Sequence, residues 1–220
     1  MKATHPKGHQ GYLVTLKIAL ISIVVIHFFG IIGLSISYTR PYFESATPIN
    51  LIISTLLLFS FHKDWNIQFI LFGLITFTVG YLIEVAGVHT GVIFGSYAYG
   101  PALGFKLWDV PLIIGINWLL LIYTTGVISK DLTKYSLVNS AIASLLMVFL
   151  DFFIEPIAVE LNFWKWEGDI IPIQNFIGWV ITAFFLQIIF SFLVFNKHNL
   201  FAKYVFIVQL VFFITLQILI

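Results

Sequence analysis

Two acidic side chains interrupt an otherwise apolar stretch of the sequence, LLMVFLDFFIEPIAVE. Asp151 and Glu155 are spaced i, i+4, so they share one face if the stretch is helical. Two like charges this close together do not ionise cheaply in a low-dielectric environment, so we expect one acid to keep its proton near neutral pH. A neutral carboxylic acid beside an ionised carboxylate is the pairing that general acid–base catalysis uses. The stretch therefore predicts a proton-transferring site.

The composition predicts that this site lies in a membrane. Hydrophobic residues make up 60% of the 220 residues, charged residues only 10%, and the mean hydropathy is +1.03, whereas a soluble domain carries about 25% charged residues. The net charge of +1 indicates no nucleic-acid partner. The absence of cysteine excludes disulfides, thiolate metal sites and cysteine nucleophiles. We expect a multi-pass protein surrounded by lipid in a bacterial or archaeal cytoplasmic membrane.

The apolar segments predict an all-α bundle of about seven transmembrane helices, forming one membrane domain over residues 1–220 with a motif-bearing core at 81–179. The predicted spans are Tyr12–Ser37, Thr47–Phe61, Ile67–Val88, Val110–Ser129, Leu137–Ile157, Asn175–Phe195 and Phe201–Ile220. The second span is short, so we expect it to tilt or to cross only in part. Basic residues favour a cytoplasmic N-terminus. That side would hold Lys2, Lys7, Lys17, Lys63, Lys130, Lys134, Lys197 and Lys203, and the outer side Arg40, Lys106 and Lys165.

Glu84 is expected at the same depth as the acidic pair. It falls near the outer end of the third span, while Asp151 and Glu155 fall near the outer end of the fifth, within one or two helical turns of the interface. Acids within spans usually face the bundle interior or a wet cavity. The competing structural interpretation is that Glu155-Pro156 ends the helix and that both acids extend to the interface.

Two long connections on the outer side, 89–109 and 158–174, are rich in aromatic residues and glycine. We expect them to fold over the mouth of the bundle or to lie in the interface, where Trp and Tyr are favoured. An aromatic belt with no further role is the alternative. His89 is either a proton relay at the mouth or an interface residue. Tyr97 and Tyr99 either line an apolar slot or lie among the headgroups.

Two outer segments resemble each other. VPLIIGINW ends at Trp118 and IPIQNFIGW ends at Trp179, and in each the tryptophan follows a proline by seven residues. Each segment begins a span that follows an acid-bearing span, so the two pairs of spans indicate a weak parallel repeat, with a site where the repeats meet. Asn117 and Asn175 would face this common cavity. Chance similarity between apolar segments is the alternative.

No cofactor or metal is expected. His5 and His9 have the i, i+4 spacing of a histidine metal box, but the pair stands alone in a tail broken by proline and glycine, and the other histidines are scattered. The glycine-rich GVIFGSYAYG lacks the lysine and the Ser or Thr of a phosphate-binding loop.

Several blocks together resemble the CruF-type carotenoid 1,2-hydratases, membrane proteins that include the bisanhydrobacterioruberin hydratases and the γ-carotene 1′,2′-hydratases. The resemblance covers roughly residues 81–179, and the flanking spans carry no matching motif. The matching positions are Glu84, Gly87, Thr90, Gly91, Phe94, Gly95, Tyr97, Tyr99, Gly104, Val110, Pro111, Trp118, Asp151, Glu155, Pro156, Trp164, Trp166, Pro172, Asn175 and Trp179.

The resemblance implies a carotenoid biosynthesis enzyme that adds water across the terminal 1,2 double bond of an acyclic ψ-end and leaves a tertiary 1-hydroxyl. Its substrate would be a hydrophobic carotenoid, and other enzymes of carotenoid biosynthesis are candidate partners. We expect Asp151 or Glu155 to donate the proton and the other to position water, with Glu84 assisting. Asp151 is favoured as donor because it lies deeper. The candidate substrate-binding residues are His89, Phe94, Tyr97, Tyr99, Asn117, Trp118, Trp164, Trp166, Asn175 and Trp179.

Two other functions fit a bundle with buried acids. A proton-coupled transporter would need a polar path from both faces, and the apolar cytoplasmic halves of the third and fifth spans disfavour it. Another carotenoid-modifying enzyme that uses carbocation chemistry, such as a cyclase or an isomerase, is the further alternative.

Overall fold

The computed structural model describes residues 6–220, with side chains from Gly11 onward. It contains the seven predicted helices, which confirms the all-α bundle. The helices are α1 (Pro6–Ser35), α2 (Arg40–Ser60), α3 (Ile67–Thr90), α4 (Ile113–Ser129), α5 (Ser136–Glu160), α6 (Ile173–Phe192) and α7 (Phe201–Leu219). Six of them are long and apolar enough to cross a membrane, and α4 is a shorter apolar helix. The protein is therefore a multi-pass membrane protein.

The second and fifth helices are longer than predicted. Helix α2 begins at Arg40 rather than at Thr47, so it is not a short span. Pro41 is tolerated because it stands in the first turn, where a missing N–H costs little. Arg40 Nε donates to the Leu34 carbonyl at 2.9 Å and thereby fixes the tight link from α1. Helix α5 continues through Pro156 to Glu160, so the proline does not end it.

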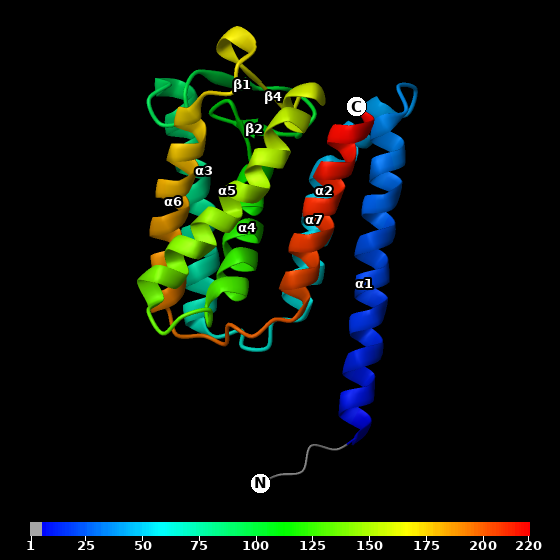
Figure 1. The fold of residues 1–220 in the computed structure, drawn as a ribbon, viewed down its shortest axis with the longest axis vertical. Helices are drawn as coiled ribbons and strands as arrows, with labels where there is room; N and C mark the ends of the chain where they lie inside the picture. The colour runs from blue at the N-terminus through cyan, green and yellow to red at the C-terminus, as the bar shows by residue number, and fades with distance from the viewer. Residues whose placement is uncertain (1–5) are drawn as a thin grey trace.

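Four short strands, which the sequence did not predict, shape the two long connections. Strand β1 (Tyr97–Tyr99) pairs antiparallel with β4 (Trp164–Trp166). Strand β2 (Lys106–Leu107) pairs with β3 (Val110–Pro111). Both connections lie over the same end of the bundle, which we call the lid end (Figure 1). We call β1 and β4 together the lid.

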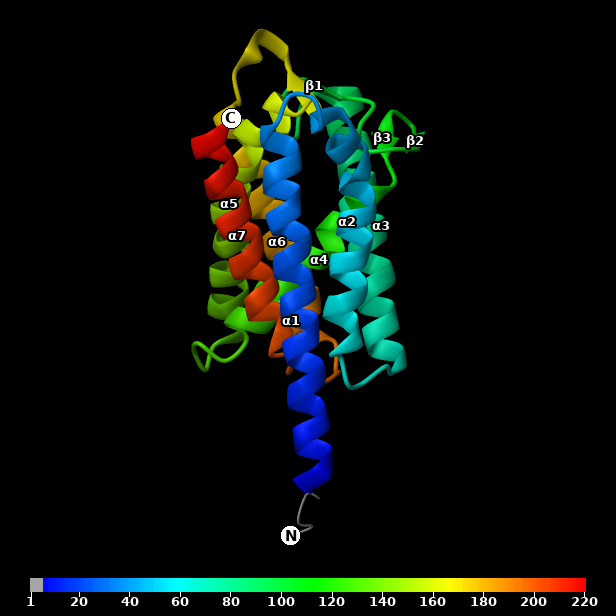
Figure 2. The same cartoon turned by 90° about the vertical axis from the view of Figure 1, so that its right-hand side faces the viewer.

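The helices form two groups. Helices α3, α4, α5 and α6 pack around one another beneath the lid, while α1, α2 and α7 stand beside them (Figures 1 and 2). The C-terminus lies at the lid end, and α1 extends beyond the bundle at the opposite end. The loops that lie at each end of the bundle are the ones that the predicted order of the seven spans places on the same side of the membrane. Which end faces the cytoplasm stays a prediction.

Close packing inside the four-helix group depends on small residues. A Cβ on Gly80 of α3 would lie 2.5 Å from the Trp118 side chain. A Cβ on Gly178 of α6 would lie 2.6 Å from the Ile93 carbonyl and 2.7 Å from the Phe94 ring. These glycines let two large side chains, Trp118 and Phe94, become fully buried, and Trp118 thereby reaches Glu84.

Candidate active site

Glu84 is held near the lid end of α3 by three hydrogen bonds. Tyr99 Oη donates to its carboxylate at 2.8 Å, Trp118 Nε1 donates at 3.0 Å, and Tyr97 Oη donates as well. Alternate residues of a strand point to the same face, which is why both β1 phenols reach one carboxylate. Burial, reinforced by the Glu84 charge, raises the pKa of Tyr97 and of Tyr99. Both phenols therefore stay protonated and act as donors.

Glu155 on α5 has a matching set of donors. Trp164 Nε1 and Trp166 Nε1 both donate to Oε2 at 3.0 Å, and Asn175 Nδ2 donates to Oε1 at 2.6 Å. The two tryptophans alternate along β4 as the tyrosines do along β1. Each glutamate thus accepts two hydrogen bonds from a lid strand and one hydrogen bond from the helix that comes after that strand in the chain.

The lid joins the two glutamates into one site. In the β1–β4 pair, Tyr97 lies opposite Trp166 and Tyr99 lies opposite Trp164. The ring centroids of these pairs are 4.8 Å and 5.9 Å apart. Cross-strand aromatic pairs of this kind fix the register of a short antiparallel ladder.

The two segments of the predicted repeat contact each other through the tryptophans that end them. Trp118 and Trp179, which end the matched segments, stack with ring centroids 4.4 Å apart and an interplanar angle of 21°. Trp118 donates to Glu84, and Asn175, from the other segment, donates to Glu155. The two donors do not stand at matched positions, because the counterpart of Asn175 in the first segment is Ile114. The repeat therefore stays a prediction.

Asp151 differs from both glutamates. It lies one helical turn from Glu155 on the same face of α5 and is fully buried. Within the described residues, neither of its carboxylate oxygens has a hydrogen-bond partner. The site thus contains two carboxylates that each accept three hydrogen bonds and one carboxyl group that accepts none from the described residues.

A small cavity lies between the two glutamates. Its volume is about 20 Å³, which is enough for one water molecule. It is lined by Glu84, Tyr97, Tyr99, Ile114, Asn117, Glu155, Trp164, Trp166, Asn175 and Trp179. Nine of these ten residues were predicted from the sequence, and Ile114 was not.

An apolar slot adjoins this cavity on the side of α1, α2 and α7. It shares Ile114, Asn117 and Trp164 with the cavity. Sequence reasoning missed its polar lining residues, which include His27 of α1 and Gln209 of α7. Isolated polar residues in apolar spans were the available signal, but these helices lie outside the motif-bearing core.

The remaining predicted residues lie outside the cavity. Phe94 is buried behind the lid, with its ring centroid 6.3 Å from that of Tyr97. The His89 side chain is 51% exposed, and its Nε2 lies 3.7 Å from a carboxylate oxygen of Asp109. His5 lies outside the described residues.

The fold and the site define a class of protein: a helical membrane protein with a buried, water-sized acidic cavity beneath an aromatic lid and beside an apolar slot. Residues 47–220 match the model of the family described as "Carotenoid biosynthesis protein". The chain belongs to this family, and the resemblance drawn from the motifs is confirmed at that level.

A curated relative has a more specific name. The chain is 31% identical over 124 residues to the bisanhydrobacterioruberin hydratase of Haloarcula japonica. The match covers 51% of this chain and 41% of the relative, so the chain spans less than half of the relative's length. No solved structure matches the chain.

Proposed function

We propose that this protein is a carotenoid hydratase, which adds water across the terminal 1,2 double bond of an acyclic ψ-end to give a tertiary 1-hydroxyl. The observation that carries the proposal is the contrast between the two glutamates, which line a cavity for one water molecule, and Asp151, which lies one helical turn from Glu155 and does not line it. Glu84 and Glu155 each accept three hydrogen bonds, while Asp151 accepts none from the part of the chain that the structure describes. The family and the hydratase name of the relative support the choice of substrate and reaction.

The donors around each acid suggest its role. A carboxylate that accepts several charge-assisted hydrogen bonds is stabilised as the anion, so Glu84 and Glu155 are the candidate bases. Burying an ion without any hydrogen bond costs far more than burying the neutral acid, so Asp151 is the candidate holder of the proton. Because Glu155 lines the cavity and Asp151 lies one turn deeper, Asp151 would pass its proton to the Glu155 carboxylate, and the Glu155 carboxyl group formed in this way would deliver the proton to the substrate.

The reaction balances with these groups alone. The acid pair would protonate C-2 of the alkene, which breaks the π bond and leaves a tertiary carbocation at C-1. Water from the cavity would then attack C-1, and the Glu84 carboxylate would take the proton that the water loses. The π faces of Tyr97 and Trp166 would stabilise the cation. Proton return from Glu84 to the acid pair would restore the starting state.

The apolar slot, with a volume of about 70 Å³, would admit the end of the polyene rather than the whole chain. It leads to the cavity at Ile114, Asn117 and Trp164, so a chain lying in the slot would place its end between the two glutamates. The cavity holds only about 20 Å³, so the isoprenoid end would have to displace side chains at this junction as it enters.

The test is pigment analysis in a host that makes one defined ψ-end carotenoid. The wild-type chain should convert this pigment to a product heavier by one water, whereas Asp151→Asn and Glu155→Gln should abolish or strongly reduce the conversion. Glu167→Gln is the matched control, because Glu167 is exposed on the loop after β4. Wild-type levels of hydroxylated pigment from both acid variants would overturn the acid–base roles. A product of unchanged mass would indicate cyclisation or isomerisation instead.

A further inference from the structure

A polar cavity of about 440 Å³ lies at the end of the bundle opposite the lid. It is bounded by the ends of α4, α5 and α6 and by the segment that leads into α7. None of its lining residues belongs to the cavity between the glutamates or to the apolar slot. It is therefore separate from the proposed active site.

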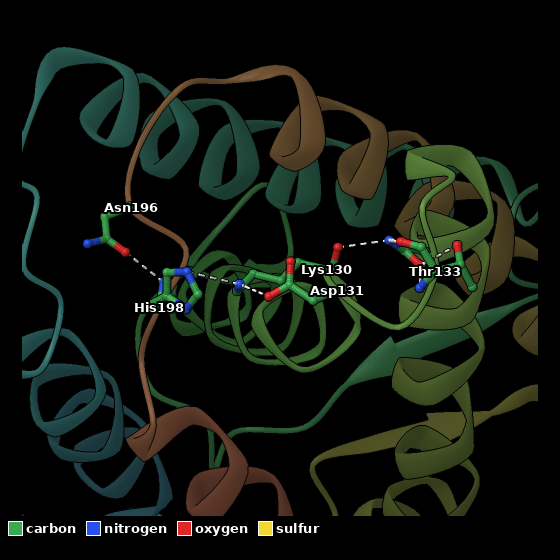
Figure 3. A network of polar contacts seen from close by, with 6 residues as sticks. Lys130, Asp131, Thr133, Asn196 and His198 are labelled. Carbon is green, nitrogen blue, oxygen red and sulfur yellow. Dashed lines mark hydrogen bonds and ion pairs between the residues drawn. The ribbon is translucent and has the colours of Figure 1, made fainter.

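Three basic side chains meet at this cavity. Lys130 Nζ contacts the Asp131 carboxylate and lies 3.4 Å from His198 Nε2 (Figure 3). The Lys130 side chain is only 14% exposed, while that of Asp131 is 74% exposed. Lys197 Nζ donates to the Leu193 carbonyl at 2.7 Å. The two lysine ammonium groups are thus held in place, whereas Asp131, the acidic partner of Lys130, is exposed to solvent.

The positive charge extends into a neighbouring cavity of about 400 Å³. This second cavity shares Lys130, Lys197 and His198 with the first and adds Lys63 and Lys203. Among the lining residues that the structure describes, Asp131 is the one acid. Such an excess of positive charge in a recess attracts anions.

The positive charges of Lys130 and Lys197 are close enough to repel each other. Burial and the nearby Lys130 charge lower the pKa of Lys197. An anion placed between the two lysines would offset this repulsion. Hydroxyl groups of Ser136 and Ser191 also line the cavity and can donate to oxygen acceptors.

The surroundings favour a lipid as the source of the anion. Exposed apolar side chains flank the cavity where α5 begins and α6 ends: Leu137 is 58% exposed, Phe192 76% and Val194 77%. In a membrane these side chains contact acyl chains, so the acyl chains of a lipid whose headgroup lay in the cavity would pack against them. Lysines near the membrane surface interact favourably with anionic headgroups.

We propose that the recess around Lys130, Lys197 and His198 binds the phosphate headgroup of an anionic phospholipid. The phosphate oxygens would accept from both ammonium groups, and the Asp131 carboxylate would be displaced toward solvent. The site is independent of the proposed hydratase activity, because it uses no residue of that site.

The test is lipid binding by the purified full chain in a neutral detergent. Phosphatidylglycerol should raise the midpoint of thermal unfolding, while phosphatidylcholine and inorganic phosphate at equal concentration should not. Lys130→Gln and Lys197→Gln should each weaken phosphatidylglycerol binding roughly fivefold. Lys165→Gln, which removes a charge from a side chain that is 77% exposed in the lid, should leave binding unchanged.

Three results would overturn the proposal. They are equal stabilisation by the two lipids, unchanged phosphatidylglycerol binding by both glutamine variants, and equal stabilisation by inorganic phosphate, which would identify the recess as a site for free phosphate. If Lys197→Gln does not fold, Lys197→Arg keeps the charge and should bind phosphatidylglycerol within about twofold of wild type. Loss of binding in this variant would also contradict the proposal.

Discussion

Replacing Glu155 should destabilise the fold, whereas replacing Asp151 should not. In the wild-type protein, both indoles donate to Oε2 of Glu155 and Asn175 Nδ2 donates to Oε1 at 2.6 Å. Glu155→Gln keeps one oxygen as the acceptor for the two indoles. It replaces the other oxygen by an amide NH2, which cannot accept from Asn175 Nδ2. Hydrogen bonds to charged groups contribute about 1.5–3 kcal/mol and neutral ones about 0.5–1.5 kcal/mol, and an unsatisfied buried donor costs about 1–3 kcal/mol. We expect a loss of about 3 kcal/mol.

Asp151→Asn removes no hydrogen bond, because the carboxyl group has no partner within the described part of the chain. Its stability should therefore stay within about 1 kcal/mol of wild type, while the hydration rate should fall roughly 10²- to 10⁴-fold, as for loss of a general acid. Glu155→Gln should thus lower the stability of the fold, whereas Asp151→Asn should lower the hydration rate without a comparable loss of stability.

The assay is thermal unfolding in detergent together with pigment conversion. A loss of about 3 kcal/mol should lower the unfolding midpoint of Glu155→Gln by roughly 6–12 °C for a chain of this size. Glu160→Gln, on the same helix, breaks an ion pair with Arg40 in which the glutamate side chain is 50% exposed, and should change the midpoint little. A midpoint for Glu155→Gln equal to that of Glu160→Gln would refute the assignment of Glu155 as an ionised, donor-bound group.

Two further predictions follow from single contacts. Tyr99→Phe removes a buried donor to Glu84 at 2.8 Å and should cost about 1–3 kcal/mol and slow hydration; an unchanged unfolding midpoint would contradict this. Burial lowers the pKa of His62, between α2 and α3, from its ordinary 6.5, so the unfolded chain takes up the proton first and stability should fall as the pH drops below about 6.5. His62→Gln should flatten the stability profile between about pH 7 and pH 5, and an identical slope in both proteins would exclude His62 as the cause.

The helices could be predicted because their signal is local. A run of apolar residues long enough to cross a bilayer indicates a span without knowledge of its neighbours. The structure confirms seven helices, six of which are long enough to span, while the fourth begins at Ile113 because Val110 and Pro111 form strand β3. The shared depth of Glu84, Asp151 and Glu155 followed from counting residues along two helices. The start of α2 could not be predicted in this way. Pro41 is compatible with the helix because it stands in the first turn, but Pro48 lies inside the helix, where proline is ordinarily a breaker.

The partners of each acid could not be predicted, because they depend on contacts between distant segments. The pairing of Tyr97 with Trp166 brings together two connections separated by two helices. The environment of Asp151 likewise depends on the lid. Both lid tryptophans donate to Glu155, and among the described residues neither donates to Asp151. Gln209 lines the slot because its helix, α7, packs against α4. The sequence does not show that these two helices are neighbours.

The central claim is that water is the source of the oxygen added to a carotenoid end. The most direct measurement is the mass of the product formed in water labelled with heavy oxygen, with the full-length chain expressed in a host that makes one ψ-end carotenoid. We predict a product that has gained one water and carries the heavy isotope in its new hydroxyl. An unlabelled hydroxyl, or a product with no added oxygen, would contradict the account.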